Sequence, residues 1–332
     1  MKIWNGYIRG INLGGWLSDC PYKEEHFKTF ITEEDIKMIA TWGLDHVRLP
    51  IDYELIHDNN SFDGMHYVDD CINWCTKYGL NIIIVLHKGP GYSSATPESN
   101  NLLFDLDLQS QFINVWKVFA SYYGDKSNVA FELLNEVISD NCLWNILVQK
   151  TVKKIREITT ETKIVIGGTN KNSIDSLNLL NKPMDENIVY TFHFYEPFLF
   201  THQKADWIQE MPNSHMEYPG DIEKYRKVSQ KLNAWDVGIN NHGINNLGVA
   251  YISNLIMSAV NVAHDHNAYL YCGKYGVISL ASSQSILNWY HDVNFIFDAF
   301  HIGRAAWTYK SMSFGISDNY DLRILNRIIS YL

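Results

Sequence analysis

Residues 79–87 read Gly79-Leu80-Asn81-Ile82-Ile83-Ile84-Val85-Leu86-His87. The segment before them, residues 67–78, has helical periodicity, and Gly79 is a typical helix terminator. Residues 81–86 follow, and all of them after Asn81 are apolar, which indicates a strand buried on both faces. Such strands belong to parallel sheets covered by helices, so this stretch predicts an α/β fold.

The same alternation extends in both directions along the chain. Short β-rich runs alternate with longer helical ones, so the sequence predicts eight strands and eight helices with no low-complexity linker between them. Eight βα units in 332 residues have the size of a closed barrel. An open doubly wound sheet would need a G-x-G-x-x-G turn after its first strand, and residues 10–15 lack that spacing. We therefore expect one (β/α)₈ TIM barrel over residues 1–332. The predicted strands cover residues 7–13, 46–50, 81–86, 129–134, 163–167, 188–193, 269–273 and 302–307.

Residues 195–245 interrupt this rhythm. They show weak periodicity and are rich in Asn, His, Tyr and Trp. A segment of that length outside a repeat is usually a functional loop, although a plain surface elaboration is an equal alternative. Its aromatic residues could close one end of a cleft, which would favour attack at chain ends: Trp207, Tyr218, Tyr225 and Trp235.

Composition narrows the function classes. The net charge is −10 with scattered basic residues, which argues against nucleic acid as a partner. No apolar run reaches the ~18 residues of a membrane span, and polar residues interrupt the start of the chain, so we expect a cytoplasmic protein. Five cysteines form no regular framework. We expect no metal or cofactor, and the sequence leaves the oligomeric state open. Aromatic residues make up 14% of the chain, which fits either a large core or a cleft that binds sugar rings.

Polar and aromatic residues recur where the predicted strands end. In a (β/α)₈ barrel these ends meet at one rim, where the chemistry takes place. Any one of them has an ordinary structural explanation, but their convergence predicts an active site. In chain order they are Asn12 and Trp16, Arg48, His87, Asn135 and Glu136, His193 and Tyr195, Lys274, and Trp307.

Glu136 is the sharpest candidate among them. It ends the segment 131–136, in which Glu132 and Glu136 would share a face because strand side chains alternate. Glu132 lies deeper and is expected to be structural, held by hydrogen bonds or by a buried base such as Arg48. Glu136 lies at the lip of the barrel, where a raised pKa would keep it protonated as a general acid.

These residues resemble glycoside hydrolase family 5, the cellulase, mannanase and β-glucosidase family of retaining barrels. The resemblance spans nearly the whole chain, and the order and placement of its short motifs make it specific. The opening Gly14-Gly15-Trp16 and residues 87–91 look most like the exo-acting β-glucanase branch. The matching pieces are residues 9–16, 47–50, 86–87, 134–136, 193–195 and 306–307.

The resemblance implies roles for the rim residues. Glu136 would be the acid/base, and Asn135 would hydrogen-bond the sugar 2-hydroxyl. Arg48 would orient the nucleophile, and Trp307 would be the platform under the sugar in the −1 subsite. The remaining candidates for substrate contact are His87, His193, Tyr195 and Trp16.

The nucleophile position departs from the family. The family has a glutamate at the end of the seventh strand in a Gly-Glu-aromatic-Gly setting, and here Gly273 and Tyr275 flank Lys274. An ammonium cannot form the glycosyl ester of a retaining mechanism, and it would favour ionised Glu136. Either the chain is an inactivated hydrolase, natural or engineered, or another carboxylate such as Glu196 takes over.

Three functions are compatible with this pattern. The first is a β-glycoside hydrolase, acting at the ends of β-glucosides, β-mannosides or short oligosaccharides and inactivated by Lys274. The second is a carbohydrate-binding pseudoenzyme on the same barrel. An unrelated barrel enzyme, such as a Schiff-base aldolase, would use Lys274 but leaves Glu136 and His193 unexplained.

Overall fold

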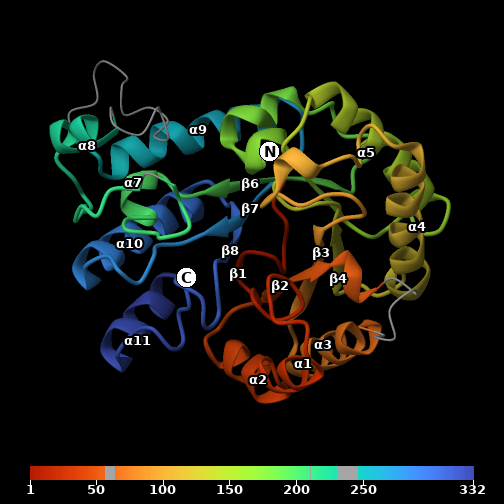
Figure 1. Cartoon of the computed structure of the whole chain (residues 1–332), viewed down its shortest axis with the longest axis horizontal. Coiled ribbons are helices and arrows are strands. Elements are labelled where there is room, and N and C mark those ends of the chain that lie inside the picture. The colour runs from red at the N-terminus through yellow and green to blue at the C-terminus, as the bar shows by residue number, and fades with distance from the viewer. Residues whose placement is uncertain (57–63, 210, 230–245) are drawn as a thin grey trace.

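The computed structural model describes residues 1–56, 64–209, 211–229 and 246–332. Eight parallel strands form a closed barrel in sequence order, and helices surround it (Figure 1). Closure is made by β1, which pairs with both β2 and β8. The predicted (β/α)₈ fold is thereby confirmed. The strands are β1 (Arg9–Asn12), β2 (His46–Asp52), β3 (Asn81–Lys88), β4 (Val129–Glu132), β5 (Ile164–Gly167), β6 (Ile188–Phe194), β7 (Tyr269–Tyr275) and β8 (Gly303–Ala306).

The helices follow local signals in the sequence. Thr32 and Asp35 form a capping box at the start of α2, and Gly79 ends α3 in the left-handed conformation with a φ of 73°. Short helices α1, α7 and α8 were not predicted. The α-helices are α1 (Glu24–Thr29), α2 (Glu33–Thr41), α3 (Met65–Tyr78), α4 (Leu106–Tyr123), α5 (Asn141–Arg156), α6 (Thr169–Asn172), α7 (Phe198–Thr201), α8 (Ile222–Ser229), α9 (Val249–Asp265), α10 (Ser283–Ala299) and α11 (Leu322–Tyr331), with 3₁₀ turns at Tyr53–Leu55, Pro97–Ser99 and Ile174–Leu179.

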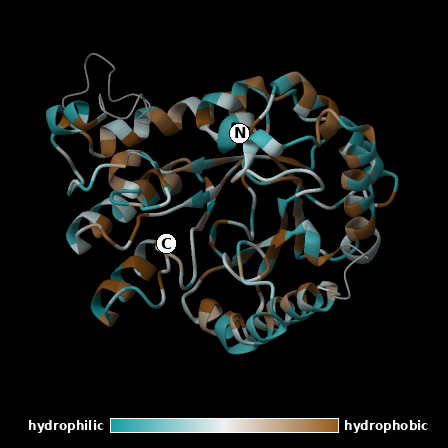
Figure 2. Cartoon of the chain, viewed as in Figure 1, coloured by the Kyte–Doolittle hydropathy of each residue, from teal (hydrophilic) through white to brown (hydrophobic). Residues whose placement is uncertain are grey.

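The core has two parts, inside and outside the barrel wall. In Figure 2 the central strands are largely brown, while the surrounding helices carry both brown and teal residues. The interior is filled by one side chain from each of several strands, and Trp4 stacks on Tyr7 at a centroid distance of 4.0 Å beneath them. This filled interior leaves the strand ends as the place for a site. The strand residues of this inner cluster are Ile83, Ala130, Val165, Val189, Tyr271 and Ala305.

The described part of the 195–245 segment packs against α10 through Tyr218. The Tyr218 hydroxyl donates to Asp292 at 2.9 Å, and its backbone N–H donates to Ser285. Tyr218 and Tyr225 are both buried, so neither can line a cleft. Residue 210 and residues 230–245, with Trp235, lie outside the described residues. The expected cleft wall is therefore reduced to Trp207, whose side chain is exposed.

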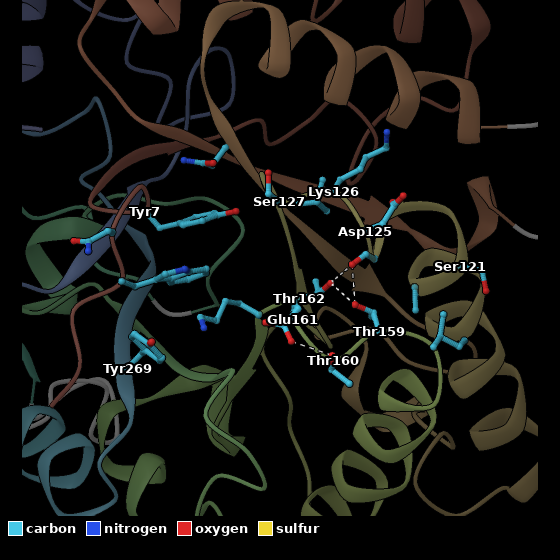
Figure 3. Close-up of a pocket in the computed structure, with 18 of the residues that line it drawn as sticks. Tyr7, Ser121, Asp125, Lys126, Ser127, Thr159, Thr160, Glu161, Thr162 and Tyr269 are labelled. Atoms are coloured by element: carbon cyan, nitrogen blue, oxygen red, sulfur yellow. Dashed lines mark hydrogen bonds between the residues drawn. The ribbon is translucent and has the colours of Figure 1, made fainter.

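A cavity of about 920 Å³ lies at the opposite end of the barrel from the rim residues (Figure 3). Residues at the starts of the strands line it, among them Tyr7 and Tyr269. The hydroxyls of Thr159 and Thr162 both donate to the carbonyl of Gly124 at 2.7 Å. These bonds hold the loops together, and residues at this end of such a barrel serve stability.

In the described part of the chain, none of the helices is both long and apolar enough to cross a membrane. All five cysteines lie within the described ranges, and each of them is free there.

Candidate active site

Five of the predicted residues meet at the rim. Glu136 Oε1 lies 2.9 Å from His193 Nδ1 and 3.4 Å from Lys274 Nζ. Lys274 Nζ also lies 3.2 Å from His87 Nε2 and 4.1 Å from the ring centre of Trp307. Strands β3, β6, β7 and β8 and the segment after β4 therefore deliver their side chains to one point.

Glu136 is positioned by a turn rather than by strand alternation. It follows the end of β4 by four residues and has a left-handed φ of 50°. Its carbonyl accepts a hydrogen bond from the Tyr92 hydroxyl at 2.8 Å, and the same hydroxyl accepts one from the Ile138 N–H. Tyr92 thus fixes the backbone on both sides of the carboxylate.

A bulge in β7 aims Lys274 into the site. The pairing of β6 with β7 runs from Phe192 opposite Cys272 to His193 opposite Lys274, so Gly273 is the extra residue. A side chain at Gly273 would come within 2.9 Å of Thr191 Oγ1, which explains the glycine. The Lys274 side chain is only 5% exposed, and its three neighbours are a carboxylate, an imidazole nitrogen and an indole face.

The electrostatics of the site follow from burial and from Lys274. Burial raises the pKa of Glu136, but the Lys274 ammonium and the His193 N–H outweigh it and hold the pKa well below its usual value. Burial lowers the pKa of His193 to about 4, and burial together with Lys274 lowers that of His87 to about 3. Both rings are therefore neutral near pH 7. Glu136 is ionised rather than protonated, contrary to the raised pKa expected for a proton donor.

Beneath this group lies a buried ion pair. Arg48 donates two hydrogen bonds of 2.7 Å to Glu132, and both side chains are fully buried. Arg48 also donates to Asn12 at 2.8 Å and to Asn135 at 3.3 Å. These contacts with Arg48 are those of a structural residue, as expected for Glu132. The guanidinium therefore donates to Glu132 and to the two amides beneath the rim.

Trp16 does not reach the site, which corrects the sequence prediction. Its ring is fully buried, stacks on Trp74 and donates its N–H to the carbonyl of Phe27 at 2.8 Å. The chain after β1 turns the indole outward into the packing of α1 and α3. A substrate contact by Trp16 is therefore ruled out by its burial.

Tyr195 and Glu196 diverge after β6. Tyr195 packs in a small cluster with Trp307 and Phe314 at the rim. Glu196 instead accepts a hydrogen bond from the Phe198 N–H through its Oε2, at the start of α7. This contact turns the carboxylate toward α7, so Glu196 is poorly placed to replace a nucleophile beside Glu136.

Asp19 and Lys88, on the other side of His87 from Lys274, were not among the residues predicted from the sequence. Asp19 Oδ2 lies 3.4 Å from His87 Nδ1, and Lys88 bridges Asp19 and Asp52. Lys88 could have been found, because it follows a strand-end histidine. Asp19 could not, because its left-handed loop, with a φ of 48°, has no periodic signal. Within the described residues, His, Cys, Asp and Glu side chains do not gather in a way that would hold a metal ion.

Known proteins match both the sequence and the fold. Residues 8–313 match the family described as cellulase (glycosyl hydrolase family 5). Endoglucanase C of Acetivibrio thermocellus is 40% identical over 92% of each chain, and cellodextrinase A of Ruminococcus flavefaciens is 37% identical over 90% of this chain and 84% of its own.

A solved structure supports the fold. Endoglucanase Cel5A from Thermotoga maritima superimposes with a TM-score of 0.77 at 23% identity, covering 98% of this chain and 97% of that one. The family match spans all eight strands, and a relative at 40% identity covers nearly all of the chain. The chain therefore belongs to glycosyl hydrolase family 5 and is, by family, a glycoside hydrolase.

Proposed function

We propose that this chain is a β-glucoside hydrolase scaffold that accepts cello-oligosaccharides and whose turnover is blocked by Lys274. The substrate class is supported by the relatives, which are named as an endoglucanase and a cellodextrinase. The rim offers groups suited to a carbohydrate: an indole face at Trp307 and the imidazole of His87.

One observation carries the proposed block, the 3.4 Å separation of Lys274 Nζ and Glu136 Oε1. Retaining hydrolysis needs two carboxyl groups about 5 Å apart, one to attack the anomeric carbon and one to protonate the leaving oxygen. Lys274 supplies no carboxylate for the first step. Its charge also keeps Glu136 ionised, which removes the proton that the same step requires.

Lys274 has a second effect on the sugar site. Its ammonium lies 4.1 Å from the centre of the Trp307 ring, an arrangement typical of a cation–π contact. A sugar stacking on this ring would compete with the ammonium for the indole. We therefore expect cello-oligosaccharides to bind this chain more weakly than they bind its Lys274→Ala variant.

The test compares four proteins: the chain, Lys274→Glu, Lys274→Ala, and Lys274→Glu combined with Glu136→Gln. Hydrolysis of an aryl β-cellobioside and an aryl β-mannobioside is measured, together with calorimetric binding of cellotetraose. Activity on the cellobioside that appears only with Lys274→Glu, and is lost again with Glu136→Gln, is the expected result. Turnover by the unmodified chain that depends on Glu136 would refute the block.

A second candidate is a carbohydrate-binding protein without turnover on the same barrel. It is favoured by the fully partnered Lys274 ammonium, which forms a stable ion pair rather than a catalytic group. Cellotetraose binding by the chain, with no hydrolysis by either the chain or Lys274→Glu, would support this reading over the first.

Attack at chain ends remains a finer proposal. It is supported by Trp207, which is 55% exposed and packs beside Phe314 at the rim cluster. The Lys274→Glu variant would then release one small product from cellohexaose at early times, whereas internal cleavage would give mixed fragments. A cytoplasmic location is likewise a proposal, supported by the five free cysteines, which suit a reducing compartment. Fractionation of cells that produce the protein would test it.

A further inference from the structure

Asn172 lies behind His193, on the side of the ring away from Glu136. Its Nδ2 is 3.3 Å from His193 Nε2, while His193 Nδ1 is 2.9 Å from Glu136 Oε1. Asn172 is fully buried. The three side chains form a line that runs from the end of β5 through β6 to the carboxylate.

The local backbone holds the Asn172 amide in position. Asn170, Lys171 and Asn172 all have left-handed φ values, of 54°, 58° and 57°. Such a run is costly for residues with a side chain and persists only where the surroundings hold it. Gly167 makes room, because a Cβ there would lie 2.4 Å from Asn172 Oδ1. The Lys171 N–H donates to the Val137 carbonyl at 3.0 Å, which ties this turn to the segment that carries Glu136.

Proton positions follow from the partners. Glu136 is ionised, so it accepts a hydrogen bond, and His193 Nδ1 must carry the proton that is donated. The ring is neutral, so Nε2 is left with a lone pair that needs a donor. The amide nitrogen of Asn172 is the donor in contact with it. Ionised Glu136 and the Asn172 donor therefore favour the same tautomer from the two sides of the ring, and the contribution of Asn172 is measured where the carboxylate no longer fixes the proton.

We propose that Asn172 is a positioning residue that sets the tautomer of His193, so that the Nδ1–H is held on Glu136. Through this hydrogen bond, Asn172 sets the pH at which the acid/base of the barrel titrates. The link to hydrolysis rests on the function proposed above, but the tautomer itself does not.

The first test uses the chain as it stands. Two-bond ¹⁵N–¹H spectra of histidine-labelled protein report which ring nitrogen is protonated, and the His193 signals are assigned by their loss in His193→Gln. We expect the Nδ1–H tautomer in the chain and in Glu136→Gln, where the amide can either donate or accept, and a mixture of tautomers in Glu136→Gln combined with Asn172→Leu. Asn172→Asp places an acceptor on Nε2, so both nitrogens should then be protonated near neutral pH.

The second test measures the acid limb and the basic limb of kcat/KM in the Lys274→Glu background. Asn172→Leu weakens a hydrogen bond to ionised Glu136, so the basic limb should move to higher pH by about one unit. Other groups that act on Glu136 are unchanged between the two proteins compared. The titratable and charged groups with an electrostatic effect on it, or affected by it, are the residue at position 274, His193, His87, Arg48, Tyr92, Tyr195 and His202.

Thr191→Val provides the matched control. Thr191 is a buried polar residue on β6, close to Gly273, whose hydroxyl has no hydrogen-bond partner among the described residues. Its replacement should change neither the tautomer nor the pH profile. The proposal is refuted if Glu136→Gln combined with Asn172→Leu keeps the pure Nδ1–H tautomer, or if Glu136→Gln combined with Thr191→Val changes the tautomer as much. An inactive Lys274→Glu background with the expected tautomers would count against the proposed function alone.

Discussion

Replacing Lys274 with methionine should raise the pKa of Glu136, because it removes the ammonium that holds this carboxyl well below its usual value. The two charged atoms are 3.4 Å apart, and their side chains are 5% and 22% exposed. At an effective dielectric constant of about 20, Coulomb's law gives about 5 kcal/mol for this distance, or roughly 3.6 pKa units as an upper bound. Methionine has a similar length and keeps the site filled.

The realised shift will be smaller than this bound. Solvent reaches the exposed part of Glu136, and the His193 N–H stays at 2.9 Å after the substitution. Opposite charges at this range ordinarily displace a carboxyl pKa by about 1–3 units. We therefore expect the Glu136 pKa to rise by an amount within that range when Lys274 becomes Met.

The assay is a ¹³C titration of glutamate side-chain carboxyls, with the Glu136 signal identified by its absence in Glu136→Gln. Lys88→Met is the matched control, because Lys88 lies on the same rim but pairs with Asp52 at 3.0 Å rather than with Glu136. An unchanged Glu136 titration in Lys274→Met would refute the reasoning. So would an equal shift in Lys88→Met.

Three further outcomes follow from the buried groups. Arg48→Met should lower the free energy of unfolding, measured in urea, by about 3–5 kcal/mol, because it leaves the Glu132 carboxylate buried without its partner. Adding Glu132→Leu should recover most of that loss. If stability were not recovered, this reasoning would be contradicted. His193 has a folded pKa of about 4, so below pH 6.5 the unfolded chain takes up a proton that the folded chain does not, and stability falls as pH drops toward 4. His193→Gln should reduce that slope by about 1.4 kcal/mol per pH unit, as measured by urea unfolding between pH 4.5 and 6.5. Trp16→Ala should lower the free energy of unfolding by about 3–5 kcal/mol and leave the Kd for cellotetraose unchanged. Weaker binding of cellotetraose would show that Trp16 does contribute to the sugar site.

Periodicity was sufficient to predict the barrel. The runs around Ile83 and Val189 are apolar on both faces, and only parallel strands under helices accommodate that pattern. Strand-end position was also sufficient to bring His87, Glu136 and Lys274 to one rim, because closure of the barrel leaves few other places for them.

Side-chain direction after a strand could not be read from the sequence. Trp16 follows β1 within a rim motif, but the chain has already turned, and the indole enters the packing of α1 and α3. Asn172 gave no signal, because its role depends on three successive left-handed residues. The ionised state of Glu136 depends on a distance to Lys274 that spacing along the chain does not contain.

The ion pair of Lys274 and Glu136 also bears on the balance between activity and thermal stability. A working retaining site holds two carboxyl groups about 5 Å apart, which is unfavourable because like charges repel and one group must keep its proton. Activity of that kind is commonly obtained at some loss of stability. Under the proposal that Lys274 occupies the nucleophile position, attraction replaces repulsion there, so this chain should melt at a higher temperature than a Lys274→Glu form. A barrel relieved of this repulsion tolerates further rim substitutions before it unfolds, which gives a hydrolase fold a physical route toward a binding role.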